Sequence, residues 1–239
     1  MQRRVVLALL AATFALCIAG CRSVPPRPTI PPGENPLEWS ADLAAFARAD
    51  RETPSAPGGV VFVGSSSIRL WDTLARDMAP LPVLNRGFGG SRLFDSVYWS
   101  HELVSVHAPA LAVVFSGTND LAGDTPKTPE RLRELFLELV ARLHAADRDL
   151  QIVYIAITPT LAREPHLSAV LATNRLIRAE CERDPRLEFV DPSPALLDAS
   201  GRPDPRFFLA DKLHLNALGY SVWTSALRPV VVRRWHAQR

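Results

Sequence analysis

The 239-residue sequence has few cysteines, almost no net charge and no apolar run long enough to cross a membrane. Its three cysteines are Cys17, Cys21 and Cys181. Two of these lie at the amino terminus, so an internal disulfide framework is excluded for the rest of the chain. Cys181 falls in a helical pattern and is expected to be a small core residue. No cluster of cysteine and histidine has the spacing of zinc ligands, so neither a metal nor a cofactor is expected.

The charge balance excludes a broad class of partners. The chain has 27 basic and 25 acidic residues. Two of the basic residues, Arg3 and Arg4, lie in a segment that we expect to be removed, which leaves 25 of each sign. A chain without a basic surplus has no general electrostatic attraction for phosphate backbones, so no nucleic-acid partner is expected.

The amino terminus has the pattern of a secretory signal. Arg3 and Arg4 precede an apolar run over 5–18, which is shorter than the roughly 20 residues of a membrane-spanning helix. The run leads into Ile18-Ala19-Gly20-Cys21, which resembles the bacterial lipoprotein box. The resemblance implies a signal peptide over 1–20 and lipidation of Cys21. A secreted protein with a cysteine near its cleavage site is the alternative.

Residues 21–35 are predicted to be a tether, because prolines are frequent in this segment and apolar side chains are rare. The tether would hold a single domain, over 36–239, on a lipid anchor in the membrane. The expected location is the bacterial cell envelope, facing the periplasm. Arg22 rather than an aspartate after Cys21 favours the outer membrane over the inner one.

From residue 60 onward, short apolar runs alternate with stretches of helical period, which is typical of βα units and a parallel sheet. The runs predict strands at 60–63, 82–85, 110–115, 151–157 and 187–190. Helices are predicted over 129–146, 167–182 and 216–236, the last with a kink at Pro229. The expected fold class is α/β, a three-layer α/β/α sandwich with a central parallel five-stranded sheet.

The first of these strands runs directly into three serines, Ser65, Ser66 and Ser67, before a helical pattern begins. Ligands of open α/β sheets bind at the carboxyl ends of strands, where helix N–H groups can stabilise a developing oxyanion. A serine at this position is therefore a candidate nucleophile. The alternative interpretation is a helix cap, since serine oxygens often accept from the first-turn N–H groups.

Later segments offer partners for such a serine. The second and third strands lead into turns with Gly90 and Asn119, whereas Thr158-Pro159-Thr160 after the fourth strand is interpreted as a plain turn. Near the end of the chain, Asp211 precedes His214 by three residues. This spacing lets the carboxylate reach one imidazole nitrogen and leaves the other free to act as a base.

Four blocks, Gly64-Ser65-Ser66, Gly87-Phe88-Gly89-Gly90, Gly117-Thr118-Asn119-Asp120 and Asp211-Lys212-Leu213-His214, resemble in order and separation those of the SGNH (GDSL-type) hydrolases. The resemblance spans residues 60–219. It implies a flavodoxin-like sandwich and hydrolysis of carboxylic esters, including acyl esters of lipids and acetyl groups on sugars. The predicted substrates are therefore small-molecule, glycan or lipid esters.

The resemblance also implies roles for individual residues. Ser66 would be the nucleophile, His214 the base and Asp211 its orienting partner, while Ser66, Gly90 and Asn119 would form the oxyanion hole. Asp191, at the end of the fifth strand, is an alternative to Asp211. Two departures from the family pattern are Ser65 and Ser91, where the family often has aspartate. Neither departure removes a catalytic group.

The remaining candidates have plainer interpretations. The other histidines lack a comparable context and are expected at the surface: His101, His107, His144, His166 and His236. Five aromatic residues could line an acyl pocket, although a core role is favoured: Phe88, Phe94, Trp99, Phe207 and Phe208.

The prediction from the sequence is thus an envelope-anchored serine esterase. Two alternatives remain open. One is a catalytically silent lipoprotein that binds glycan or lipid in the same cleft. The other is a metal-dependent phosphoesterase that uses Asp120, Asp211 and His214.

Overall fold

The computed structural model describes residues 25–123 and 125–238, so the predicted signal peptide and Cys21 lie outside the described residues. Its centre is one sheet of five parallel strands in the order β2-β1-β3-β4-β5. The strands are β1 (Val60–Gly64), β2 (Val83–Gly87), β3 (Leu111–Phe115), β4 (Gln151–Ile155) and β5 (Leu187–Val190). The predicted α/β fold with a parallel five-stranded sheet is confirmed.

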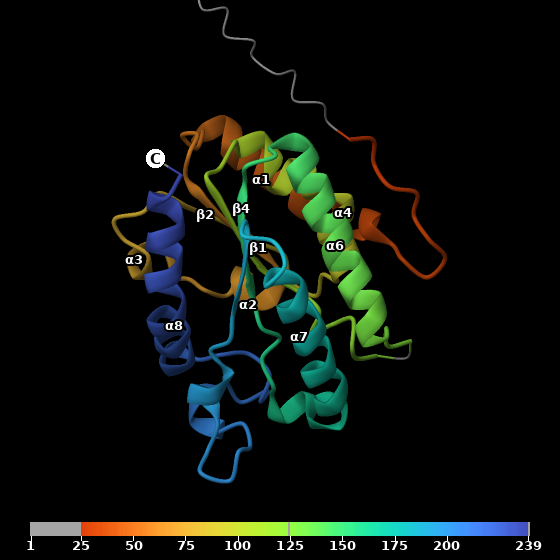
Figure 1. Ribbon diagram of the computed structural model, residues 1–239, viewed down its shortest axis with the longest axis vertical. Coiled ribbons are helices and arrows are strands. Elements are labelled where there is room, and N and C mark those ends of the chain that lie inside the picture. Colours follow the sequence, from red (N-terminus) through yellow and green to blue (C-terminus); the bar gives the residue numbers. More distant parts are fainter. Residues whose placement is uncertain (1–24, 124, 239) are drawn as a thin grey trace, which may run out of the picture.

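Helices cover both faces of this sheet (Figure 1). The α-helices are α1 (Ser40–Glu52), α2 (Ser66–Arg69), α3 (Leu74–Asp77), α4 (Leu93–Tyr98), α5 (Ser100–Leu103), α6 (Pro129–Ala146), α7 (Leu167–Cys181) and α8 (Ala217–His236). Short 3-10 helices are η1 (Pro36–Trp39), η2 (Ser105–His107), η3 (Leu161–His166), η4 (Ser193–Leu196) and η5 (Pro205–Phe207). Within residues 25–123 and 125–238, no helix is both long and apolar enough to cross a bilayer.

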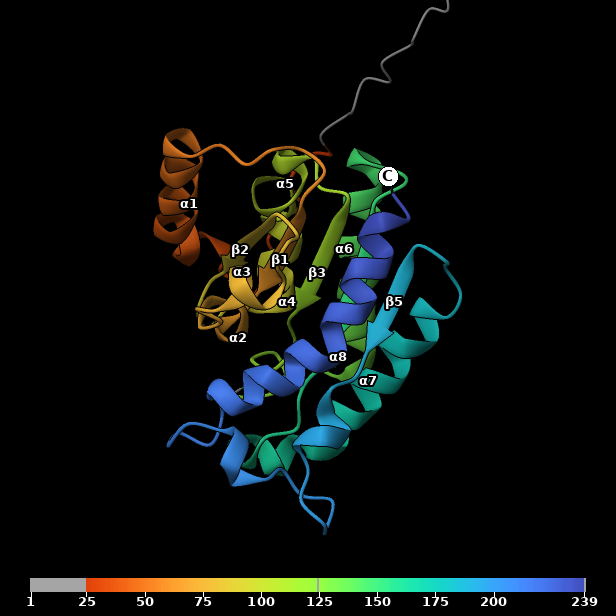
Figure 2. The ribbon, with the colours of Figure 1, turned by 90° about the vertical axis from the view of Figure 1, so that its left-hand side faces the viewer.

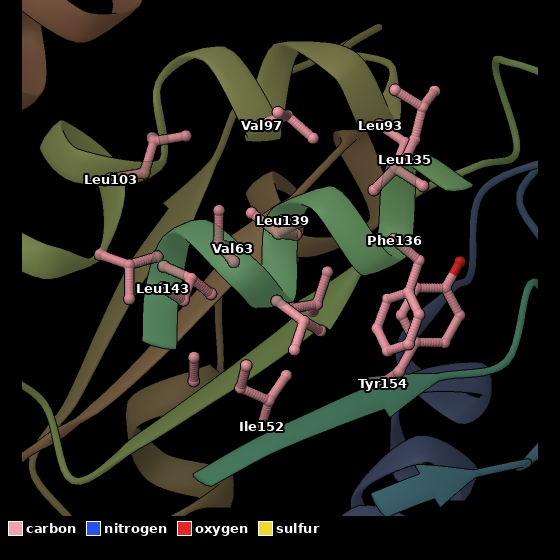
Figure 3. Packing of buried hydrophobic residues seen from close by; sticks show 14 of the residues in the cluster. Val63, Leu93, Val97, Leu103, Leu135, Phe136, Leu139, Leu143, Ile152 and Tyr154 are labelled. Atoms are coloured by element: carbon pink, nitrogen blue, oxygen red, sulfur yellow. The ribbon is translucent and has the colours of Figure 1, made fainter. Parts of the chain in front are cut away.

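The alternation of side chains along β1 explains the two cores. Val61 and Val63 pack with α4, α6 and α7 on one face, whereas Val60 and Phe62 pack with α2, α3 and α8 on the other. Successive residues of a strand point to opposite faces, so a strand covered on both sides is apolar at every position. Figure 3 shows the first core, in which Leu139 of α6 lies over Val63.

The helix predictions are largely confirmed. Helix α6 has the predicted bounds, with Thr128 accepting a hydrogen bond from the Arg131 N–H at its start. Helix α8 continues through Pro229, and Figure 2 shows that it bends part-way along its length. Such a bend is expected where a proline removes a helical N–H donor. Cys181 is buried as expected, and burial raises the pKa of its thiol to about 12.

Residues 25–35, predicted to be part of a tether, lie along the surface of the domain, and we call them the strap. Ile30 packs against the first core. Arg27 pairs with Glu102 and lies over the Trp99 ring, 4.4 Å from its centre. These contacts bury apolar surface and pair charges, so this part of the predicted tether is held against the domain.

Candidate active site

The first candidate residue, Ser66, is the first residue of α2 and directly follows the end of β1. The turn needs glycine at position 64, where φ is +146° and an added Cβ would lie 1.9 Å from the Phe115 carbonyl oxygen. The N–H of Ser65 donates to that same oxygen at 3.1 Å. The close approach of β1 to β3 therefore fixes where the serine hydroxyl lies.

The structure brings Ser66, His214 and Asp211 into one chain of hydrogen bonds. His214 Nε2 lies 2.8 Å from Ser66 Oγ, and His214 Nδ1 lies 2.7 Å from Asp211 Oδ2. Asp211 Oδ1 accepts from the backbone N–H groups of Leu213 and His214. With both oxygens engaged, the carboxylate holds the imidazole so that Nε2 faces the serine.

The loop that carries His214 is held by its own polar contacts. Asn216 caps α8 by accepting from the N–H groups of Leu218 and Gly219, and its amide donates to the Phe208 carbonyl. The hydrogen bond from His214 lowers the pKa of Asp211 to about 2. The carboxylate is therefore ionised across the neutral and mildly acidic range.

Gly90 and Asn119 lie on neighbouring loops of the site. The Asn119 side-chain amide donates to the Ser91 carbonyl at 3.0 Å, which leaves its second N–H hydrogen for another acceptor. Gly90 has φ of +85°, a conformation that favours glycine. Among the described residues, the backbone N–H groups of Ser66 and Gly90 have no hydrogen-bond partner.

Asp120, next to Asn119, has a structural role in this geometry. It is almost fully buried, and its Oδ2 accepts from the Leu93 N–H at 2.9 Å. Its Oδ1 lies 3.0 Å from Lys127 Nζ, which in turn lies 2.9 Å from Glu34 Oε1 of the strap. Asp120 therefore joins the loop of Asn119 to the loop that carries Gly90.

A small cavity of about 10 Å³ adjoins Ser66 and His214. Besides the predicted residues, it is lined by side chains that include Phe115, Thr158, Thr160, Leu213 and Trp223. The two threonines were interpreted as a plain turn, and this interpretation missed their place in the cavity wall. Their position after β4, at the edge where β1 and β3 also end, is the signal that could have identified them.

The alternatives to the main assignment lie elsewhere. Asp191 accepts from the Ser193 N–H and pairs with Arg178, at 3.3 Å, rather than with His214. In residues 25–123 and 125–238, no three His, Cys, Asp or Glu side chains are grouped as metal ligands. The predicted phosphoesterase ligands are therefore not assembled.

Two further expectations concern histidine and aromatic residues. Phe88 and Phe94 are fully buried core residues, as favoured from the sequence. His107 was expected at the surface, but this prediction is wrong, since only 8% of the residue is exposed. It is buried because the loop after α1 covers it, with Ser55 Oγ 3.1 Å from its Nδ1.

A family-level match agrees with this geometry. Residues 58–222 match the GDSL-like lipase/acylhydrolase family, which covers more than half of the chain. The chain belongs to this family. It is thus an ester-hydrolysing enzyme of the SGNH type. No curated protein matches the chain.

Solved structures of the same fold come from diverse organisms. A GDSL-like lipase from Bacteroides thetaiotaomicron is 19% identical, with a TM-score of 0.66 over 83% of this chain and 98% of that one. A carbohydrate esterase family 3 protein from Talaromyces cellulolyticus is 15% identical, with a TM-score of 0.59 over 75% of this chain and 99% of that one. A lipase/acylhydrolase from Enterococcus faecalis is 18% identical, with a TM-score of 0.57 over 74% and 96%. At these identities, the likeness establishes the fold of this GDSL-like chain.

Proposed function

We propose that this GDSL-like enzyme is a serine esterase that cleaves short acyl esters through Ser66, His214 and Asp211. The observation that carries the proposal is the unbroken hydrogen-bond chain from Asp211 through His214 to the Ser66 hydroxyl. A serine, an imidazole and a carboxylate in this order make a weak nucleophile reactive without a cofactor.

The reaction proceeds in two halves. Ser66 Oγ forms a bond to the ester carbonyl carbon as its proton passes to His214 Nε2. The carbon–oxygen bond to the alcohol then breaks, and His214 returns the proton to the departing alcohol. In the second half, water gives a proton to His214 and attacks the acyl-enzyme, and the acid leaves as Ser66 regains its proton. Asp211 stays ionised throughout and stabilises the imidazolium.

The negative oxygen of each tetrahedral intermediate needs donors that are already in position. The backbone N–H groups of Ser66 and Gly90 and the second N–H of the Asn119 amide would serve this purpose. The Ser66 N–H belongs to the first turn of α2, where N–H groups have no partner within the helix. The unpaired state of these donors supports the assignment.

The small cavity offers no deep groove for a long acyl chain. Its volume of about 10 Å³ is room for about one water molecule, and its wall combines threonine, serine and asparagine side chains with Phe115, Leu213 and Trp223. A long acyl chain would need a deep apolar groove to gain free energy from burial. An acetyl group needs no such groove, so we assign acetyl and similarly short acyl esters to this site.

The second part of the proposal is that Cys21 carries a lipid that anchors the enzyme to the cell envelope, on the periplasmic face. This part depends on the lipoprotein box in the sequence. The alternative is a catalytically silent lipoprotein that uses the same cleft to bind glycan or lipid. The aligned hydroxyl and imidazole weigh against this alternative, because a binding protein has no need of a base at that position.

The test is hydrolysis of a short acyl ester by the soluble domain. Ser66→Ala should abolish hydrolysis, whereas Ser65→Ala and Ser67→Ala, the matched controls on either side, should retain it. A fluorophosphonate probe should label the wild type and both controls. Full activity of Ser66→Ala, or an unlabelled wild type, would contradict the assignment.

A further inference from the structure

The strap runs from one end of the molecule toward the other. We call the end where the strands finish the catalytic end, because Ser66 and Asn119 follow β1 and β3 there. The strap begins at the opposite end. There, Arg142, near the carboxyl end of α6, donates to the Pro25 carbonyl at 3.4 Å, shortly before the chain enters β4. Figure 1 shows the strap descending beside α4 and α6.

The strap reaches the catalytic end nine residues after Pro25. Glu34 pairs with Lys127 there, and Lys127 pairs with Asp120 next to the candidate oxyanion donor Asn119. Between the two ends, Ile30 packs against the core. Arg142 is 13 residues from the start of α6 at Pro129, and Lys127 lies just before that start, so the strap spans about 20 Å at 1.5 Å per residue.

The position of Pro25 limits how the domain sits on an anchored Cys21. Only residues 22–24 lie between Cys21 and Pro25. Even fully extended, four peptide units reach about 14 Å, which is roughly half the length of α6. A lipid on Cys21 would therefore hold the opposite end of the domain near the bilayer and keep the catalytic end away from it.

The surface beside the catalytic serine has both apolar and polar parts. A cavity of about 530 Å³ shares Leu215 with the small catalytic cavity, and its wall includes Leu70 and Tyr220 as well as Asp72 and Ser221. Carboxylate and hydroxyl groups in a cleft of this size can bind the hydroxyl groups of an alcohol.

We infer that the strap directs the active site away from the anchoring membrane, toward short acyl esters on water-soluble polyhydroxylated polymers. Lipids of the anchoring bilayer are then out of reach. The inference rests on the proposed esterase activity and on lipidation of Cys21. The strap is what makes the difference, since a free tether over 21–35 would let the active site turn back to the membrane.

Orientation is measured by energy transfer from a dye on the full-length lipidated protein to acceptor lipids in phosphatidylethanolamine and phosphatidylglycerol vesicles. The dye is attached at Val106→Cys, at the opposite end, or at Leu218→Cys, in the first turn of α8 at the catalytic end. Both side chains are about half exposed. Cys181 is buried and stays unlabelled. Transfer should be strong from position 106 and weak from position 218. Helix α8 begins at the catalytic end and runs about 30 Å toward the opposite end, so position 218 should lie much farther from the bilayer.

Two variants test whether the strap is responsible. A flexible Gly/Ser spacer of about 20 residues inserted after Ser23 should bring the two transfer signals together. The double variant Arg27→Ala/Ile30→Ala, which loosens the strap, should also make the two transfer signals more alike. Arg148→Ala removes an exposed arginine at the opposite end without touching the strap, and it should change nothing. Equal transfer from both positions in the unmodified chain would overturn the inference.

Activity gives a second readout. Vesicle-bound enzyme should release acetate from an acetylated polysaccharide in solution at least about tenfold faster than from an acetyl ester on the headgroups of its own vesicle. The spacer should raise only the vesicle rate. Equal rates without the spacer would contradict the inference.

Two control experiments test the esterase activity and the lipidation of Cys21 separately from the orientation of the domain. If the soluble domain cleaves neither ester in a Ser66-dependent way, the proposed function fails. If Cys21→Ser binds vesicles as well as the wild type, Cys21 is not the membrane anchor, and the esterase assignment is unaffected.

Discussion

Two groups of serine, histidine and aspartate lie at the two ends of the sheet, and only one has the geometry of a catalytic triad. At the end opposite to Ser66, Ser55 Oγ lies 3.1 Å from His107 Nδ1. Asp50 Oδ2 lies 3.8 Å from His107 Nε2, which is too long for a hydrogen bond. A cavity of about 240 Å³ adjoins Ser55 and His107, much larger than the one at Ser66.

The difference lies in how each carboxylate is used. Asp50 pairs with the Arg86 guanidinium, a nearly buried group, so its charge is already balanced. Burial and the nearby Arg86 lower the pKa of His107. Ser55 follows the carboxyl end of α1, where carbonyl oxygens are exposed rather than N–H groups. The three residue types and a cavity are therefore not sufficient; the carboxylate must be free to hold the imidazole, and the serine must begin a helix.

The largest expected effect separates the two histidines. His214→Ala should lower kcat by about 10⁴-fold or more, because the Ser66 proton loses its acceptor. His107→Ala should leave kcat within about twofold, since it lies at the other end of the sheet. Steady-state kinetics on a short acyl ester give both values. A large loss of kcat in His107→Ala would show that His107 also contributes to catalysis.

Substitution of Asp211 should affect catalysis, whereas substitution of Asp50 should affect stability. Asp211→Asn should lower kcat by roughly 10²–10⁴-fold, because the imidazole loses its orientation and the charge that stabilises its protonated form. Asp50→Asn should instead lower the free energy of unfolding by about 2–4 kcal/mol, because it leaves the buried Arg86 charge without a partner. Kinetics and urea denaturation of both variants make the comparison. Unchanged stability of Asp50→Asn would show that Arg86 is not balanced by this pair.

Asn119→Ala should lower kcat by about 10²–10³-fold, because one donor to the oxyanion is lost. The change in KM should be small, since the donor acts mainly in the transition state. Asp120, its neighbour, is the matched contrast. Asp120→Asn should lower thermal stability, because the buried pair with Lys127 is broken. A rise in KM alone for Asn119→Ala would argue for substrate binding rather than transition-state stabilisation.

The smallest expected effect is the pH dependence of stability that comes from Asp95 of α4. Burial raises the pKa of Asp95 to about 6. The folded state therefore holds this proton more tightly than the unfolded state, and the contribution to the free energy of unfolding grows as pH falls from 8 toward 4. The gain should be at most about 3 kcal/mol.

Denaturation midpoints measured across this pH range test the effect, and Asp95→Asn should flatten the profile. Asp211 is the contrast, because its depressed pKa of about 2 keeps it ionised over the whole range. A profile that stays equally steep in Asp95→Asn would assign the titration to another group.

Much of the fold was predictable because it depends on local patterns. The period of Leu132, Leu135 and Leu139 predicted α6, and the apolar run before Gly64 predicted β1. The positions of Thr158 and of the buried His107 were not predicted. Both depend on which loops from distant parts of the chain meet, and neither has a distinctive local pattern.

The contacts between the strap and the domain were not predicted, for a related reason. A proline-rich segment with few apolar residues is typical of an extended, semi-rigid tether, and its composition does not show that Arg27 pairs with Glu102 or that Ile30 packs against the first core.

The sequence by itself determined the parallel α/β class, the strand-to-helix turn at Ser66 and the short spacing that joins Asp211 to His214, because each depends on neighbours within a few residues. Only the tertiary structure decided that His214 meets a serine 148 residues earlier and that the strap lies along the domain. It also decided that Asp50, in the second group of serine, histidine and aspartate, pairs with Arg86 and forms no hydrogen bond with His107. Contacts of this kind depend on how the strands are ordered in the sheet and on which loops meet at its ends, and no local pattern encodes that arrangement.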